Sequence, residues 1–97
     1  MVLELAILNV IPNKEHEFER AFMEAKGIIG AMPGFISLEL KRSIEQANRY
    51  ALLVQWASLE DHTVGFRQSP EYQHWRKLLH HFYDPFPQVE HYGHVDV

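Results

Sequence analysis

The sequence predicts an α+β fold of the ferredoxin-like class, βαββαβ, with an antiparallel sheet and the helices on one face. Two regions carry apolar residues at helical spacing, four shorter segments are aliphatic, β-branched or alternating, and their order along the chain matches this class. The 97 residues suffice for one hydrophobic core without a disulfide or a structural metal. We therefore expect residues 1–97 to form a single domain.

The first strand is expected over residues 2–11, which are nearly all aliphatic. Strands that are covered on both faces lose the alternation of apolar and polar residues, so this strand is expected in the middle of the sheet. Residues 14–32 place their apolar side chains on a single stripe and predict the first helix. Asn13 stands where the N-cap of this helix belongs, and Pro33-Gly34 ends it.

Residues 35–42 alternate apolar and polar side chains, which predicts a half-buried strand, and residues 49–56 predict the next strand. A polar connection separates them, so the two strands are expected to pair as a hairpin. The first and third strands are apolar on both faces, whereas the helices can cover only one face of the sheet. An uncovered apolar face marks a partner surface, and we predict a homodimer built by sheet-to-sheet packing.

The second helical region is expected in two pieces. Ser58 and Asp61 have the spacing of a capping box, which begins a short helix. Ser69-Pro70 then supplies an N-cap and a proline at the first position of a new helix. Two closely spaced prolines after residue 84 end this helix, and residues 88–95 predict a last short strand.

The composition excludes several functions. A net charge of −4 with scattered Lys and Arg residues offers no footprint for nucleic acid. The absence of cysteine excludes a disulfide framework, a thiolate nucleophile and iron–sulfur ligation. The apolar N-terminal stretch is too short for a transmembrane span and lacks a basic leader, so a cytoplasmic protein without a membrane partner is expected.

The candidate site lies in and just before the segment 58–87, which combines imidazoles, aromatic rings and a guanidinium at a density that ordinary helical cores avoid. The residues expected to line a pocket are Trp56, Phe66, Trp75, His80 and Tyr83. The residues expected to take part in chemistry are His62, His81 and Arg67. A neutral histidine can act as a general base near neutral pH, and a guanidinium can bind an anionic or carbonyl group.

Each candidate also has a plainer interpretation. Trp75 fits the apolar stripe of its helix, His62 fits the seam between helix and sheet, and Arg67 can pair with a neighbouring acid. His80 and His81 occupy the last helical turn, where the helix dipole favours a cation. An aromatic-rich amphipathic helix without a pocket would show the same pattern.

No metal site is expected. His91 and His94 lie on opposite faces of a strand, and His80 and His81 point about 100° apart on a helix, so neither pair suits one ion. The chain also lacks a glycine-rich phosphate loop and a nucleophile elbow. Nucleotide-dependent chemistry and serine-nucleophile chemistry therefore lack their motifs.

The strand ending V-Q-W-A-S-L-E-D-H and the following F-R-Q-S-P-E-Y resemble the antibiotic biosynthesis monooxygenase family, and the resemblance covers nearly the whole chain. It implies a dimeric α+β barrel with a small pocket between helices and sheet in each subunit. In members that oxidise polyphenolic or quinol-like substrates with molecular oxygen and no cofactor, the pocket carries an Asn, a Trp and a Tyr. The corresponding residues here are Leu52, Trp56 and His62, so only the Trp is kept.

Other members of the family degrade haem with an Asn, a Trp and a His. The resemblance places Ala6, Phe66 and Arg76 at these positions, so none of the three is kept and haem degradation is not expected.

The first hypothesis is a cofactor-independent monooxygenase, or a related oxidoreductase, that acts on a small aromatic substrate with O2. One of the candidate histidines would take a proton from a phenolic hydroxyl, and Arg67 or Tyr83 would stabilise the oxyanion that forms. The alternatives are a dimer that binds a small molecule without turnover, and an oxygen-independent isomerase or lyase on the same barrel.

Overall fold

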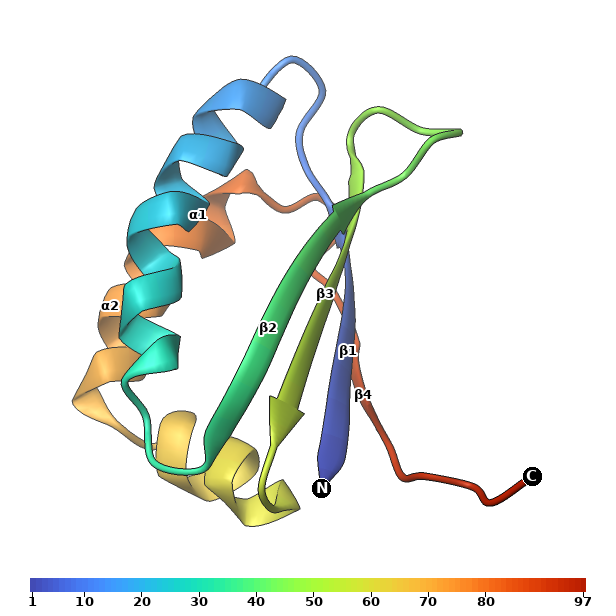
Figure 1. Cartoon of the computed structure of the whole chain (residues 1–97). Coiled ribbons are helices and arrows are strands. Elements are labelled where there is room, and N and C mark those ends of the chain that lie inside the picture. Colours follow the sequence, from blue (N-terminus) through green and yellow to red (C-terminus); the bar gives the residue numbers. More distant parts are fainter.

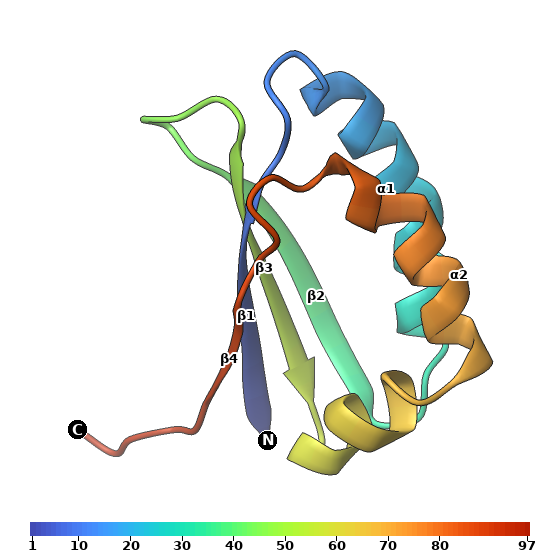
Figure 2. The same ribbon diagram turned by 180° about the vertical axis from the view of Figure 1, so that it is seen from behind.

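The computed structural model describes residues 1–97 and confirms the α+β, ferredoxin-like βαββαβ arrangement (Figure 1). Four strands form one antiparallel sheet in the order β2-β3-β1-β4, and both helices lie on the same side of it (Figures 1 and 2). The elements in chain order are β1 Val2–Asn9, α1 Glu15–Gly30, β2 Phe35–Arg42, β3 Arg49–Trp56, a π-helix Asp61–Phe66, α2 Pro70–Leu79, a 3₁₀ turn His80–Phe82 and β4 Val89–Tyr92.

The strand β1 lies in the middle of the sheet, as its apolar composition predicted. It pairs with β3 on one side and with β4 on the other, so that Ala6 is opposite both Leu52 and Val89. The predicted hairpin between β2 and β3 is also present. Small and aliphatic side chains therefore meet at the centre of the face that the helices cover.

The core fills the space between the sheet and the two helices. The apolar stripe of α1 buries Phe18, Phe22, Ala25 and Ile29, as the helical spacing predicted. The ring of Phe22 also meets that of Trp75 edge-on, with centroids 5.8 Å apart, and this contact joins α1 to α2. None of the helices has the length and the apolar character needed to cross a membrane.

The ends of several elements differ from the prediction. β1 ends at Asn9 and β4 at Tyr92, so both strands are shorter than expected. The prediction that Asn13 caps α1 was wrong, because Lys14 precedes the first helical residue and makes no side-chain cap bond. Asn13 instead has a φ of 73°, and this left-handed conformation, which Asn tolerates, turns the chain between β1 and α1.

Both predicted serine caps are present. The Ser58 Oγ accepts the backbone N–H of Asp61 at 3.2 Å, and the Ser69 Oγ accepts that of Tyr72 at 3.1 Å. The segment that begins at Ser58 continues as a π-helix instead of the short α-helix expected. π-helical turns are rare and concentrate at functional sites, which directs attention to the side chains of this segment.

Candidate functional site

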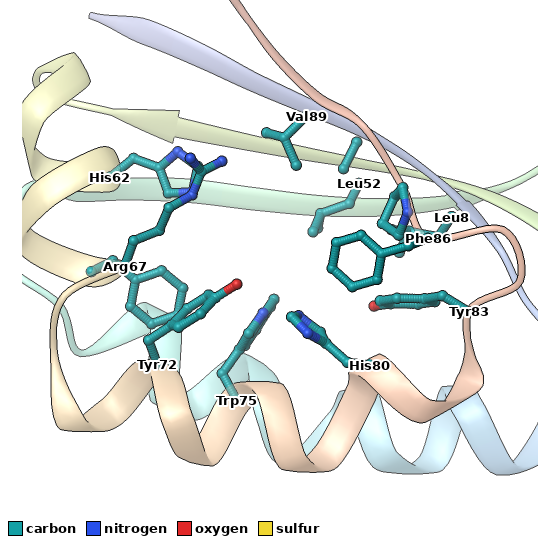
Figure 3. A pocket seen from close by; sticks show the side chains of 13 residues that line it. Leu8, Leu52, His62, Arg67, Tyr72, Trp75, His80, Tyr83, Phe86 and Val89 are labelled. Carbon is teal, nitrogen blue, oxygen red and sulfur yellow. The ribbon is translucent and has the colours of Figure 1, made fainter.

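A cavity of about 400 Å³ lies between α2 and the sheet (Figure 3). Its aliphatic lining from the strands includes Ala6, Leu8, Leu52 and Val89. Its aromatic lining consists of Phe66, Tyr72, Trp75, Tyr83 and Phe86. Its lining also has three basic side chains, those of His62, Arg67 and His80. An apolar wall with a few convergent polar groups is typical of a small-molecule site.

The structure brings six of the eight candidate residues together at this cavity. They are His62, Phe66, Arg67, Trp75, His80 and Tyr83. The other two lie elsewhere. Trp56 is fully buried behind the wall, where its ring stacks on that of His62 with a centroid separation of 5.4 Å. His81, in the 3₁₀ turn after α2, is exposed beside Arg76 and Lys77 and does not line the cavity.

A buried carboxyl group lies next to the cavity wall. Glu4, in β1, is only 5% exposed, and its Oε1 accepts the indole N–H of Trp56 at 2.9 Å. The same oxygen lies 3.3 Å from Nε2 of His62. Burial raises the pKa of Glu4, whereas the Trp56 hydrogen bond and the positive charge of Arg67 act in the opposite direction. The two contacts supply the partners that a buried carboxyl group requires.

His62 has a polar neighbour at each ring nitrogen. Its Nε2 faces Glu4, and its Nδ1 lies 2.8 Å from Nε2 of His91, which belongs to β4. Burial, with the charge of Arg67 and the neighbouring His91, lowers the pKa of His62 to about 3, so the ring is neutral at pH 7. One proton is shared in the hydrogen bond between the His62 and His91 rings, and the tautomers decide which ring donates it. Nδ1 of His62 is therefore occupied, and its Nε2 lies against the Glu4 carboxyl group.

The surroundings of His80 differ from those of His62. Its ring lies among those of Tyr72, Tyr83 and Phe86, with centroid separations of 5.9, 5.9 and 5.0 Å, and makes no hydrogen bond within the chain. Burial, and then the charge of Arg76, lowers the pKa of His80, which keeps it neutral at pH 7. A neutral imidazole with unoccupied nitrogens can accept a proton from a molecule in the cavity.

Two tyrosines accompany His80 in the cavity wall. Tyr72 and Tyr83 point their rings toward the cavity in Figure 3. Burial, followed by the effects of Tyr72 and Glu4, raises the pKa of Tyr83, so its hydroxyl keeps its proton and can donate a hydrogen bond. No group of three His, Asp or Glu side chains converges in a way that could hold a metal ion.

Comparison with known proteins shows the family to which this chain belongs. The family model described as antibiotic biosynthesis monooxygenase matches residues 1–78. This chain belongs to the antibiotic biosynthesis monooxygenase family. It is similar to the uncharacterized protein YczJ of Bacillus subtilis (strain 168), with 52% identity over 95 residues that cover 98% of this chain and 100% of that protein.

Two solved structures are similar to this chain over most of its length. A protein from Bordetella bronchiseptica assigned to the antibiotic biosynthesis monooxygenases is 37% identical, with a TM-score of 0.92 and coverage of 97% of this chain and 96% of that one. SnoaB, a cofactor-independent oxygenase from Streptomyces nogalater, is 20% identical, with a TM-score of 0.73 and coverage of 94% and 87%. At that identity the likeness to SnoaB shows a common fold.

Sequence reasoning missed several residues of the site in this family member. Tyr72, Phe86, Glu4 and His91 were not among the candidates, although the first two line the cavity and the other two hold His62. A signal existed for Glu4, because it is the one acid in the central strand, whose other residues as far as Leu8 are apolar. No comparable signal existed for His91, which depends on the pairing of β1 with β4.

Proposed function

We propose that this protein is a cofactor-independent monooxygenase that oxidises a small aromatic, quinol-like substrate with molecular oxygen. The observation that carries the proposal is His80, a neutral imidazole with free nitrogens inside an aromatic cavity. Membership of the antibiotic biosynthesis monooxygenase family supports it, as does the shared fold with a cofactor-independent oxygenase.

The chemistry follows from removal of a proton. His80 accepts the proton of a phenolic hydroxyl, and the hydroxyl of Tyr83 donates a hydrogen bond to the oxyanion, which preorganised donors stabilise best. The phenolate is electron-rich enough to reduce O2 without a flavin or a metal. In the overall reaction a substrate RH2 and O2 give RO and water, so the substrate supplies the electrons that reduce the second oxygen atom.

The first test is oxygen consumption by the metal-free protein with a panel of hydroquinones and polyphenols and no added cofactor. Oxygen uptake in proportion to product is the expected result. Leu52, which stands where oxygenases of the family have a polar residue, favours a second candidate, a protein that binds its ligand without turnover. Clear binding by calorimetry with no oxygen uptake across the panel would favour that candidate, and product formed without oxygen would indicate an isomerase or a lyase.

The pH dependence of the rate follows from His80. Since burial and Arg76 lower its pKa below the ordinary 6.5, kcat/KM is expected to stay high at pH 6.5 and to fall only at lower pH, where His80 gains a proton. The exposed Arg76 supplies one of the two causes, so Arg76→Gln is expected to move the midpoint of this fall to higher pH. A profile that Arg76→Gln leaves unchanged would argue against His80 as the base.

The dimer remains part of this proposal. The helices cover one side of the sheet, and Figures 1 and 2 show no element over the other side. The uncovered side presents apolar residues of the two central strands, Leu5 and Ile7 from β1 and Leu53 from β3, and Ile7 is 41% exposed. A second copy that packs on this face would bury them, as a two-fold dimer does.

Introducing a charge on this face is expected to separate the subunits. Leu53→Lys should convert the dimer to a monomer at micromolar concentration, because it buries an unpaired ammonium group in an apolar interface. The control is Val64→Lys, which adds the same charge at a 50% exposed position of the π-helix and should leave the dimer intact. Size-exclusion chromatography with light scattering gives the masses. A native chain that is already monomeric at these concentrations would contradict the dimer.

A further inference from the structure

The cavity carries one permanent positive charge and no negative one. Arg67 is the only lining side chain that is charged at neutral pH, since His62 and His80 are neutral and no Asp or Glu lines the cavity. We propose that Arg67 forms an anion-binding subsite, and that the substrate is an aromatic hydroxy acid whose carboxylate pairs with its guanidinium. This inference rests on the proposed function and names the substrate class for the same cavity.

The guanidinium of Arg67 is free to take a partner. It forms no ion pair within the chain. The buried Glu4 carboxyl, which interacts with Arg67 electrostatically, is already bonded to Trp56 and faces His62. A guanidinium that lines a cavity without a carboxylate partner matches the planar, two-oxygen geometry of a carboxylate.

The positive field of Arg67 acts on the groups around it. After burial, which is the larger cause, its charge lowers the pKa of both His62 and His91. These two rings therefore stay neutral and add no competing charge at this end of the cavity. A carboxylate bound there would meet a single cation.

The backbone beneath Arg67 is firmly held. Its N–H donates to the carbonyl oxygen of His62 at 3.1 Å, which closes the last turn of the π-helix. The His62 side chain is in turn joined to β1 through Glu4 and to β4 through His91. The buried network thus fixes the backbone of Arg67 relative to the sheet, while its exposed side chain remains able to turn toward a ligand.

The two ends of the cavity differ in chemistry. In Figure 3, Arg67 and His62 lie at one end, and His80, Tyr83 and Phe86 lie toward the other. A ligand that spans the cavity would place its carboxylate at Arg67 and a hydroxyl group at His80. Aromatic side chains form the walls between these ends, which suits a flat ring system.

The volume sets the size of this ligand. A cavity of about 150 Å³ holds one benzene ring. The 400 Å³ found here therefore accommodates a compound of two fused rings with its substituents. A hydroxynaphthoic acid has this size, is flat, and carries an acid and a hydroxyl group at opposite ends.

The experiment compares two ligands that share the ring system and the hydroxyl group and differ in one substituent, a charged carboxylate or its neutral methyl ester. Binding of 6-hydroxy-2-naphthoate and of its methyl ester is measured by calorimetry, without oxygen and at low ionic strength, on the native protein and on Arg67→Met. We expect the native protein to bind the acid at least tenfold more tightly than the ester. Arg67→Met should reduce this preference to within about twofold and leave the affinity for the ester unchanged, while Arg67→Lys should keep part of the preference.

Arg76→Met is the matched control, because Arg76 is exposed in the basic cluster on the outer side of α2. It should keep the preference for the acid. Equal affinities of the native protein for acid and ester would overturn the subsite. A preference that survives Arg67→Met and disappears in Arg76→Met would also overturn it, since the anion would then bind on the outer surface. Thermal unfolding curves verify that each variant is folded.

Oxygen uptake measured separately distinguishes this inference from the proposed function. A preference for the acid that depends on Arg67, without any oxygen uptake, supports the subsite and contradicts the oxygenase. Oxygen uptake with identical kcat/KM for acid and ester contradicts the subsite and supports the oxygenase.

Discussion

His80→Gln is expected to lower kcat by about 10²–10⁴-fold, the usual contribution of a general base. Glutamine keeps a polar side chain of similar length but cannot accept the proton of a phenol at neutral pH. The residue has no hydrogen-bond partner in the chain, so its replacement leaves no buried group unpaired and the fold should be retained. The measurement is single-turnover oxidation, compared with ligand affinity determined by calorimetry.

The neighbouring histidine provides the control. His81→Gln makes the same chemical change at an exposed position of the 3₁₀ turn after α2, next to Arg76 and Lys77. Its kcat should stay within about twofold of the native value. Equal losses in the two variants, or native activity in His80→Gln, would remove His80 from the mechanism.

The largest effect on stability is expected at the buried pair of Glu4 and His62. His62→Leu removes the partner of a carboxyl group that is 5% exposed and leaves it bonded to Trp56 alone. Leaving a buried polar group without one of its partners costs about 1–3 kcal/mol. Since about 1 kcal/mol corresponds to roughly 4–8 °C in a domain of this size, Tm should fall by about 4 °C or more.

The double variant Glu4→Leu/His62→Leu tests the physical reason. It removes the unpaired carboxyl group as well, so its loss of unfolding free energy should be smaller than the sum of the two single losses. His94→Leu is the control, because His94 pairs with Asp96 at the surface with 83% of its side chain exposed, and its effect should be under about 0.5 kcal/mol. Additive losses in Glu4→Leu and His62→Leu would contradict a coupled buried pair.

Local patterns determined most of the fold. The apolar stripe of α1, the alternation in β2 and the serine caps at Ser58 and Ser69 were all predictable, because each depends on side chains within a few residues of one another. The order of these elements then determined the ferredoxin-like class. The region of the site was predictable as well, since one segment concentrates the rings and imidazoles that line the cavity.

Some local features were decided by the tertiary structure. The turn at Asn13 and the π-helix after Ser58 replace a predicted cap and a predicted short α-helix. The π-helix begins at Asp61. Gly34, which precedes β2 and has a φ of 83°, lies so close to Asp61 that a Cβ on Gly34 would overlap the Asp61 carboxyl group. Contacts of this kind join distant segments, so neighbouring sequence cannot reveal them.

For the histidines, too, the sequence predicted the region and the tertiary structure decided the role of each residue. The sequence favoured His62, His81 and His80 alike as bases, and only the structure separates them. His62 meets a carboxyl group in β1 and, 29 residues further along the chain, His91 in β4, because β1 pairs with β4. His80 and His81 are successive residues of the 3₁₀ turn, about 120° apart, so that His80 lines the cavity whereas His81 does not. Sequence composition determined that imidazoles gather here, and the register of the sheet and the orientation of α2 decided which of them is free to accept a proton.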